Sequence, residues 1–290
     1  MCGLNQEFGM SDKWRISPEY SKYVDARIRA SQTHLGDALI YVNPARIEVF
    51  NTIKINGREK EKDVGENYKL NIATKSIKYI MDLDKNCRDI NKTVQARKIA
   101  TIALDVGVPP EVIGAIIKQE THFSTDSADM NKGQGVGPMQ LTSITLQDMF
   151  IRPEVYDSSI KNFVGPKKKY KSFAEALRAK ADNEDIDLGK FGNKFFEFYK
   201  KNREYFDKYK GVYNNAPKAL REKYTKSLSN YDLNVYLGCW LYKMRSKNKS
   251  EKQAIISYNN SPSRYAYERA VSDTIRHVRK NIPEIITINS

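Results

Sequence analysis

The sequence predicts a mainly α-helical protein. Apolar residues recur at steps of three and four along much of the chain, which is the period of an amphipathic helix. Gly and Pro residues stand where these runs begin or end. One segment, ARIEVFNTIKI at 45–55, has the composition of a strand, and it ends in an Asn56-Gly57 turn signal. With 290 residues, the chain can hold one large domain or two smaller ones.

Residues 1–88 are interpreted as a partly helical N-terminal extension of unknown role. A short helix is expected at about 18–31, and the charged stretch at 58–63 is expected to be an exposed linker. From about Asn67 the pattern becomes helical. The apolar positions that should face a core there are Leu70, Ile72, Ile77, Ile80 and Met81.

The remaining residues, 89–290, are interpreted as one helical domain. A helix near 92–105 should stop at Gly107, which has the place of a C-cap residue. The following Pro109-Pro110 pair predicts a tight corner before the next helix. A further helix is expected at 142–150.

Pro153 should end that helix, and the segment that follows, at about 151–228, is basic, rich in aromatic residues and helical in its spacing. Two interpretations of its aromatic residues are open. They could stack on sugar rings or bases, or they could pack a small helical subdomain against the rest of the domain. The aromatic residues are Phe191, Phe195, Phe196, Phe198, Tyr199, Tyr205, Phe206, Tyr209 and Tyr213.

Glu120 is the strongest candidate for a catalytic residue. The apolar stripe of the helix after Pro110 consists of Val112, Ile113, Ile116 and Ile117, and the helical period carries this stripe onto Glu120. Burial raises the pKa of a carboxyl group, and a carboxyl group that is protonated near neutral pH can act as a general acid. The alternative is that Glu120 ends the helix at a polar rim or pairs with a basic residue.

The segments around Glu120 resemble those of the goose-type-lysozyme-like lytic transglycosylases. IIKQETHF at 116–123 resembles the catalytic signature of that family, and GVGPMQLT at 135–142 resembles its glycine-rich segment. DLNVYLGCWLYKM at 232–244 and AIISYNNSPSRY at 254–265 resemble its third and fourth segments. The four occur in the family's order, so the resemblance implies a lysozyme-like catalytic domain.

This chain also departs from the family's pattern. Pro138 stands where the family has Leu, and Asn260-Ser261 replaces the usual Ala-Gly. The loop between Glu120 and the glutamine of the second segment is longer than usual. The connection from Gln140 to Asn234 is much longer than the family's, so about 151–228 is interpreted as a long helical insertion. The resemblance covers about 92–148 and 230–282, which is under half of the chain.

The resemblance implies a role for each matched position. Glu120 would be the acid and base, and Tyr258 would stand near it, with a hydroxyl that orients the carboxylate or holds the substrate's N-acetyl group. Asn234 would bind backbone between helices, and Asn259 would fix the turn that presents Tyr258. The candidate substrate-binding residues are Gln140, Met139, Tyr258, Asn259 and Gly137.

The implied reaction is cleavage of the β-1,4 bond between N-acetylmuramic acid (MurNAc) and N-acetylglucosamine (GlcNAc) in peptidoglycan, which gives 1,6-anhydro-MurNAc ends. Family members need one carboxylate only, because the substrate's N-acetyl group assists departure. Most glycosidases use a second carboxylate. For a lysozyme or, as a weaker alternative, a chitinase, the candidates here are Asp126 and Asp129, although simple turn formation is their alternative role. Two further alternatives are a non-catalytic wall-binding component of a phage tail or secretion machine and, more distantly, a nucleic-acid-binding protein.

The charge and the small set of histidines limit the partners. A net charge of +14 favours an anionic partner, which could be an anionic wall polymer, or reflects a lysine-rich solvated surface. The basic residues do not gather in a stripe and no nucleic-acid motif is present, so nucleic acid is not expected. No cofactor or metal is expected, because His34, His122 and His277 are scattered without ligand spacing. A monomer without a transmembrane segment is expected, unless the chain belongs to a virion or secretion machine.

The cysteines and the N-terminus bear on location. Cys2, Cys87 and Cys239 form no disulfide framework, and Cys239 lies on an apolar helix as a buried free thiol. No signal peptide is recognised at the N-terminus. The expected location is the cell envelope, with Cys2 either a lipid anchor or an incidental residue, or else a phage protein that is delivered to the wall.

Overall fold

The computed structural model describes residues 58–88, 91–124, 135–152, 170–210, 213–259 and 261–289. The chain divides into two compact units, Met1–Glu66 and Asn67–Ser290. The expected helix at 18–31 and the expected strand at 45–55 lie outside the described residues.

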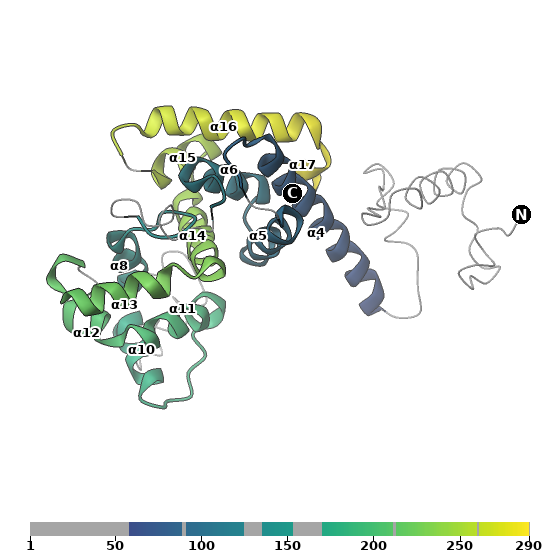
Figure 1. Ribbon diagram of the computed structural model, residues 1–290. Helices are drawn as coiled ribbons and strands as arrows, with labels where there is room; N and C mark the ends of the chain where they lie inside the picture. The colour runs from purple at the N-terminus through teal and green to yellow at the C-terminus, as the bar shows by residue number, and fades with distance from the viewer. Residues whose placement is uncertain are drawn as a thin grey trace, which may run out of the picture. The chain divides into compact units, whose positions relative to one another are not determined.

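The described residues are mainly helical, as the periodicity predicted (Figure 1). The helices are α4 (Arg58–Leu83), α5 (Lys92–Val106), α6 (Pro110–Thr121), α8 (Ser143–Ile151), α10 (Phe173–Ala181), α11 (Gly189–Lys201), α12 (Arg203–Tyr209), η3 (Tyr213–Asn215), α13 (Lys218–Leu228), α14 (Tyr231–Ser246), α15 (Glu251–Tyr258), α16 (Arg264–Asn281) and α17 (Glu284–Ile288). No helix in the described part of the chain has the length and apolar character needed to cross a membrane.

Helix α4 corrects one prediction and confirms another. The charged stretch at 58–63 lies inside this helix and is not a linker. The reason is that Arg, Glu and Lys are good helix formers, and the stretch has no Gly or Pro to stop them. The predicted core positions Ile77, Ile80 and Met81 are fully buried.

The corner between α5 and α6 forms as predicted. Helix α5 ends at Gly107, which has a φ of 77° and whose backbone N–H donates to the carbonyls of Ala103 and Leu104. Helix α6 then begins at Pro110 in the favourable first helical position. Its apolar residues are buried, so α6 lies inside the second unit. The residues in its last turn are therefore held close to the core.

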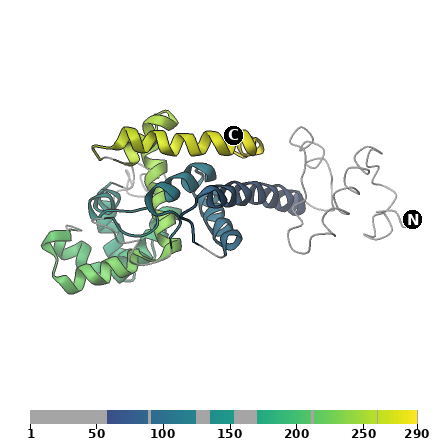
Figure 2. The same ribbon diagram turned by 45° about the horizontal axis from the view of Figure 1, so that its top comes forward.

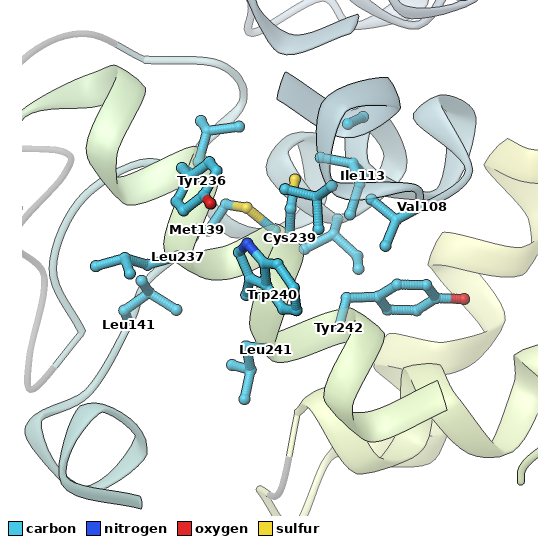
Figure 3. Close-up of a cluster of buried hydrophobic side chains, with 14 of the residues drawn as sticks. Val108, Ile113, Met139, Leu141, Tyr236, Leu237, Cys239, Trp240, Leu241 and Tyr242 are labelled. Atoms are coloured by element: carbon cyan, nitrogen blue, oxygen red, sulfur yellow. The ribbon is translucent and has the colours of Figure 1, made fainter. Parts of the chain in front are cut away.

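Helices α14 and α16 organise the second unit. Helix α14 passes through its middle and packs against α5, α13 and α15. Helix α16 lies along α6 and α15, on the side away from α10–α13 (Figures 1 and 2). The buried face of α14 holds Cys239 and Trp240, with Met139 and Ile113 packed around them (Figure 3). Cys239 is a free thiol in this core, as predicted.

The aromatic residues of the insertion fill its own core. Phe195, Tyr199 and Phe206 are fully buried, and each stacks or packs against Phe150 of α8 at centroid distances of 6.4, 6.0 and 4.9 Å. Phe191 packs against Trp240 of α14 at 5.1 Å. Of the two interpretations, packing is confirmed for these buried rings, because a buried ring has no face open to a sugar or a base.

Candidate active site

Glu120 lies in the last turn of α6 and is partly buried. Burial raises the pKa of its carboxyl group from 4.5 to about 7, and a hydrogen bond from Tyr267 opposes the shift. The negative end of the helix dipole also lies at this terminus and disfavours the anion. No basic side chain of the described residues contributes to the shift. Within that part of the chain, Glu120 does not pair with a basic residue.

Two tyrosines from different helices lie beside Glu120. Tyr267 comes from α16 and Tyr258 from the end of α15, and both interact electrostatically with the Glu120 carboxylate. Burial is the main cause that raises the pKa of each phenol well above its usual value, and the charge of Glu120 adds to it. Both hydroxyls therefore keep their protons around neutral pH.

The two hydroxyls have different partners. The hydroxyl of Tyr258 donates to the backbone carbonyl of Met139 at 2.8 Å. Since a hydroxyl has one proton, Tyr258 in this arrangement does not donate to Glu120, which is one of the two roles expected for it; contact with the substrate's N-acetyl group stays a prediction. The hydroxyl of Tyr267 has no partner in strict hydrogen-bond geometry, so its interaction with Glu120 is loosely aligned.

The glycine-rich segment forms a tight hairpin next to these residues. Val136 and Leu141 pair through two backbone hydrogen bonds of 3.0 and 2.9 Å, and the amide of Gln140 closes the turn on the carbonyl of Gly137. Gln140 has a φ of 47°, and its side-chain amide donates to the Gly137 carbonyl at 2.9 Å. Gln140 thus stabilises its own turn, and its expected place beside Glu120 stays a prediction.

Asn234 holds this hairpin on α14. Its side chain is fully buried, accepts from the backbone N–H of Met139 at 3.0 Å and donates to the carbonyl of Val136 at 2.8 Å. The prediction that Asn234 binds backbone is confirmed. Gly137 has a φ of 75°, and a Cβ there would lie 2.2 Å from the Asn234 amide nitrogen. The structure places Gly137 where only glycine lets these two groups meet.

Met139 is buried at the same contact. A Cβ on Gly238 of α14 would lie 2.2 Å from the Met139 sulfur, so the thioether occupies the space that this glycine leaves. Both its backbone N–H and its carbonyl bind side chains of other helices. Met139 is thus the residue through which the hairpin is attached to α14 and α15.

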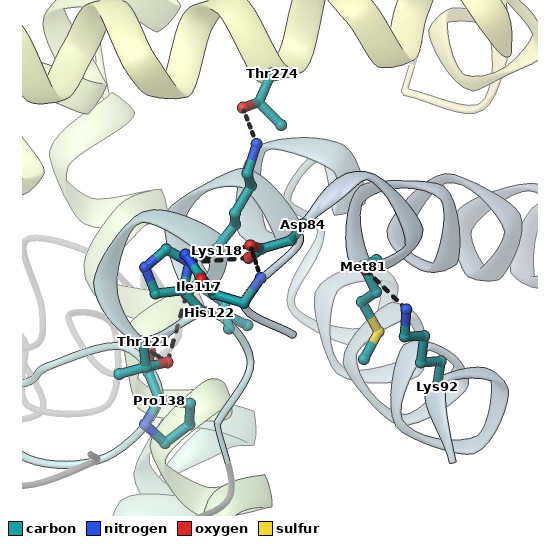
Figure 4. A network of polar contacts seen from close by, with 10 residues as sticks. Met81, Asp84, Lys92, Ile117, Lys118, Thr121, His122, Pro138 and Thr274 are labelled. Carbon is teal, nitrogen blue, oxygen red and sulfur yellow. Dashed lines mark hydrogen bonds and ion pairs between the residues drawn. The ribbon is translucent and has the colours of Figure 1, made fainter. Parts of the chain in front are cut away.

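Thr121 attaches the hairpin to the helix that carries Glu120. Its hydroxyl donates to the carbonyl of Pro138 at 3.0 Å (Figure 4). On the other side, the exposed His122 binds the buried carboxylate of Asp84 through Nδ1 at 3.0 Å. Lys118 donates to Thr274 of α16 at 3.3 Å. The chain on both sides of Glu120 is therefore bound to the hairpin, to Asp84 and to α16.

The remaining candidates divide between described and undescribed residues. Asn259 caps α15, and its side chain accepts from the backbone N–H of Ser261 at 3.0 Å, which agrees with the predicted role in the turn after Tyr258. Asp126, Asp129 and Cys2 lie outside the described residues. In the part of the chain that the structure describes, no group of three His, Cys, Asp or Glu could hold a metal ion.

Sequence reasoning missed Tyr267. The residue starts a buried stripe on α16 that continues through Val271, Thr274, Ile275 and Val278 at steps of three and four. This spacing was a usable signal, because a tyrosine on such a stripe must bring its hydroxyl into the interior.

The arrangement combines a carboxyl group that titrates near neutral pH, a neutral hydroxyl beside it and a hairpin attached to three helices. These groups can donate and accept a proton at a fixed position. Compared with protein-family models, with curated proteins and with solved structures, the chain has no match in any of the three.

Proposed function

We propose that the protein is a peptidoglycan lytic transglycosylase with a lysozyme-like catalytic domain. The observation that carries the proposal is the Glu120 carboxyl group, whose pKa of about 7 leaves it partly protonated at neutral pH. A glycosidic bond breaks through an oxocarbenium-like state that needs a proton on the leaving oxygen. Glu120 is suited to deliver that proton.

The connections around Glu120 support the proposal. Each of the four segments that resemble the family takes part in them. The hairpin at 135–142 receives one hydrogen bond from Thr121 beside Glu120, one from Tyr258 and one from Asn234. Segments that are distant in the sequence thus meet at one hairpin, which is bound to the residue that follows Glu120 in the chain.

In the proposed reaction, the substrate is the β-1,4 bond between MurNAc and GlcNAc. Glu120 protonates the oxygen that leaves with GlcNAc, while the N-acetyl group of MurNAc assists departure. The Glu120 carboxylate then takes the proton of the MurNAc 6-hydroxyl, whose oxygen closes the 1,6-anhydro ring. The net charge of +14 would attract the protein to anionic polymers of the cell envelope.

Digestion of purified sacculi by the full-length protein tests this function. Mass spectrometry of the soluble products should find 1,6-anhydro-MurNAc ends, which are lighter by one water than the reducing ends that a lysozyme leaves. Reducing ends as the main product would indicate hydrolysis. Binding to sacculi without release of muropeptides would indicate a non-catalytic wall-binding component.

Glu120→Gln should lower the rate of this digestion by about 10²–10⁴-fold, because the amide cannot supply the proton. The matched control is Glu222→Gln on the exposed face of α13, which removes a carboxylate of the same size that pairs with the exposed Lys218 and takes no part in the hairpin contacts described above. The control should digest sacculi at the wild-type rate. An active, folded Glu120→Gln protein would refute the assignment of Glu120.

A further inference from the structure

Helix α16 packs against α6 in an antiparallel register that brings Tyr267 to Glu120. Three side-chain contacts define this register. Arg279 binds Glu111 at 2.7 Å at one end, Thr274 accepts from Lys118 at 3.3 Å, and Tyr267 interacts with Glu120 at the other end. Since residue numbers rise along α6 as they fall along α16, the position of Tyr267 follows from the packing of whole helices.

The Tyr267 hydroxyl is available to donate a hydrogen bond to Glu120. The residue is 6% exposed, and within the described part of the chain its hydroxyl has no other partner in hydrogen-bond geometry. A buried hydroxyl without a partner costs about 1–3 kcal/mol, so such a group is retained where it has another use. Tyr258 is the other nearby hydroxyl, and its proton already binds the carbonyl of Met139.

We propose that Tyr267 is the positioning residue of Glu120, and that its hydroxyl donates a hydrogen bond to the carboxylate that forms when Glu120 gives up its proton. This inference rests on the proposed function of Glu120 as acid and base. A hydroxyl donor stabilises the ionised form of a carboxyl group and leaves the protonated form without an equivalent gain. Tyr267 therefore assists proton delivery without touching the substrate.

The titratable groups around Glu120 define how this effect can be measured. Tyr267 faces it from α16 and Tyr258 from α15, where the Cys239 thiol of α14 adds to the environment of Tyr258. Lys118 of α6 is bound to Thr274, and His122, which directly follows α6, is bound to Asp84. Tyr267 is the group whose hydrogen bond lowers the pKa of Glu120.

The test is Tyr267→Phe in the full-length protein, with Tyr265→Phe as the matched control. Tyr265 lies on the same helix and is 58% exposed. The carboxyl titration of Glu120 is followed by carbon NMR, with Glu120→Gln to assign the signal, and kcat and KM on solubilised glycan strands are measured from pH 4 to 9. Tyr267→Phe should shift the titration and the alkaline limb of kcat/KM to higher pH. Below pH 6 it should lower kcat about tenfold with KM unchanged.

A titration midpoint in Tyr267→Phe equal to that of the wild type would overturn the proposal. Should Tyr267→Phe fail to fold, 3-fluorotyrosine at position 267 keeps the ring and strengthens the donor. It should shift the Glu120 titration to lower pH, and an unchanged midpoint would overturn the proposal equally. The NMR readout needs no activity. A Glu120→Gln protein that still digests sacculi would therefore refute the proposed function while the titration still decides the role of Tyr267.

Discussion

Helix α6 carries a carboxylate that is shielded from solvent at each end, and the two have opposite kinds of partner. Glu111, in the first turn, is fully buried and binds the Arg279 guanidinium at 2.7 Å and the Asn289 amide at 2.8 Å. Arg279 also binds Glu251, so this end of the helix is an ion-pair network. Glu120, in the last turn, has tyrosine hydroxyls beside it and no cation among the residues that the structure describes.

The difference teaches that burial alone does not mark a functional carboxylate. A guanidinium compensates the charge of Glu111, and the helix dipole favours a carboxylate at that end. Glu120 lies at the opposite end of the helix and has no guanidinium partner in the described part of the chain, and burial moves its pKa to about 7. The partner decides whether a buried acid stabilises the fold or is available for proton transfer.

Removal of the cation from the Glu111 end should have the largest effect on stability. Arg279→Met leaves the buried Glu111 without its guanidinium, so the free energy of unfolding should fall by about 3–5 kcal/mol. Urea denaturation at pH 7 measures this. The control is Arg276→Met on the exposed face of the same helix, which should change stability by about 0.5 kcal/mol or less. Equal losses in both variants would contradict the importance of the Glu111–Arg279 pair.

Neutralisation of the Glu120 end should act in the other direction. Because folding raises the pKa of Glu120, the wild type gains full stability from this group below pH 4.5 and loses it as the pH rises through about 7. Glu120→Gln does not lose this stability, because an amide does not ionise in this pH range. At pH 8 it should be up to about 3 kcal/mol more stable than the wild type, and the gain should disappear near pH 4.

Chemical denaturation of both proteins between pH 4 and 9 checks this prediction. Glu111→Gln is the matched variant on the same helix, and at pH 8 it should be less stable than the wild type because Arg279 loses a partner. If the difference in the free energy of unfolding between Glu120→Gln and the wild type does not vary with pH, ionisation of Glu120 does not destabilise the folded protein.

The smallest effect is expected at Tyr258. Tyr258→Phe removes the hydrogen bond to the Met139 carbonyl and loosens the hairpin beside Glu120. Turnover of sacculi should fall at least about tenfold, or about 1.4 kcal/mol of transition-state stabilisation. Unlike Tyr267→Phe, this variant should keep the midpoint of the alkaline limb. Unchanged turnover would remove Tyr258 from the site.

The sequence by itself determined the helices and the position of Glu120 on a buried stripe. The Gly107 cap, the start of α6 at Pro110 and the core positions of α4 follow from rules that act within a few residues, which is why they could be predicted. The same local rules misjudged 58–63, where charge suggested a linker although the residues are good helix formers.

Only the tertiary structure decided which partner each polar group has. Glu111 binds a residue 168 positions away, Asn234 reaches the hairpin from 95 positions away, and Tyr258 binds the carbonyl of Met139 and leaves Tyr267 as the hydroxyl that opposes the pKa shift of Glu120. Periodicity shows which face of a helix is buried, but it does not show which other helix covers that face. Hydrogen-bond partners are chosen by that packing, because a buried polar group must find its partner among the atoms that happen to surround it.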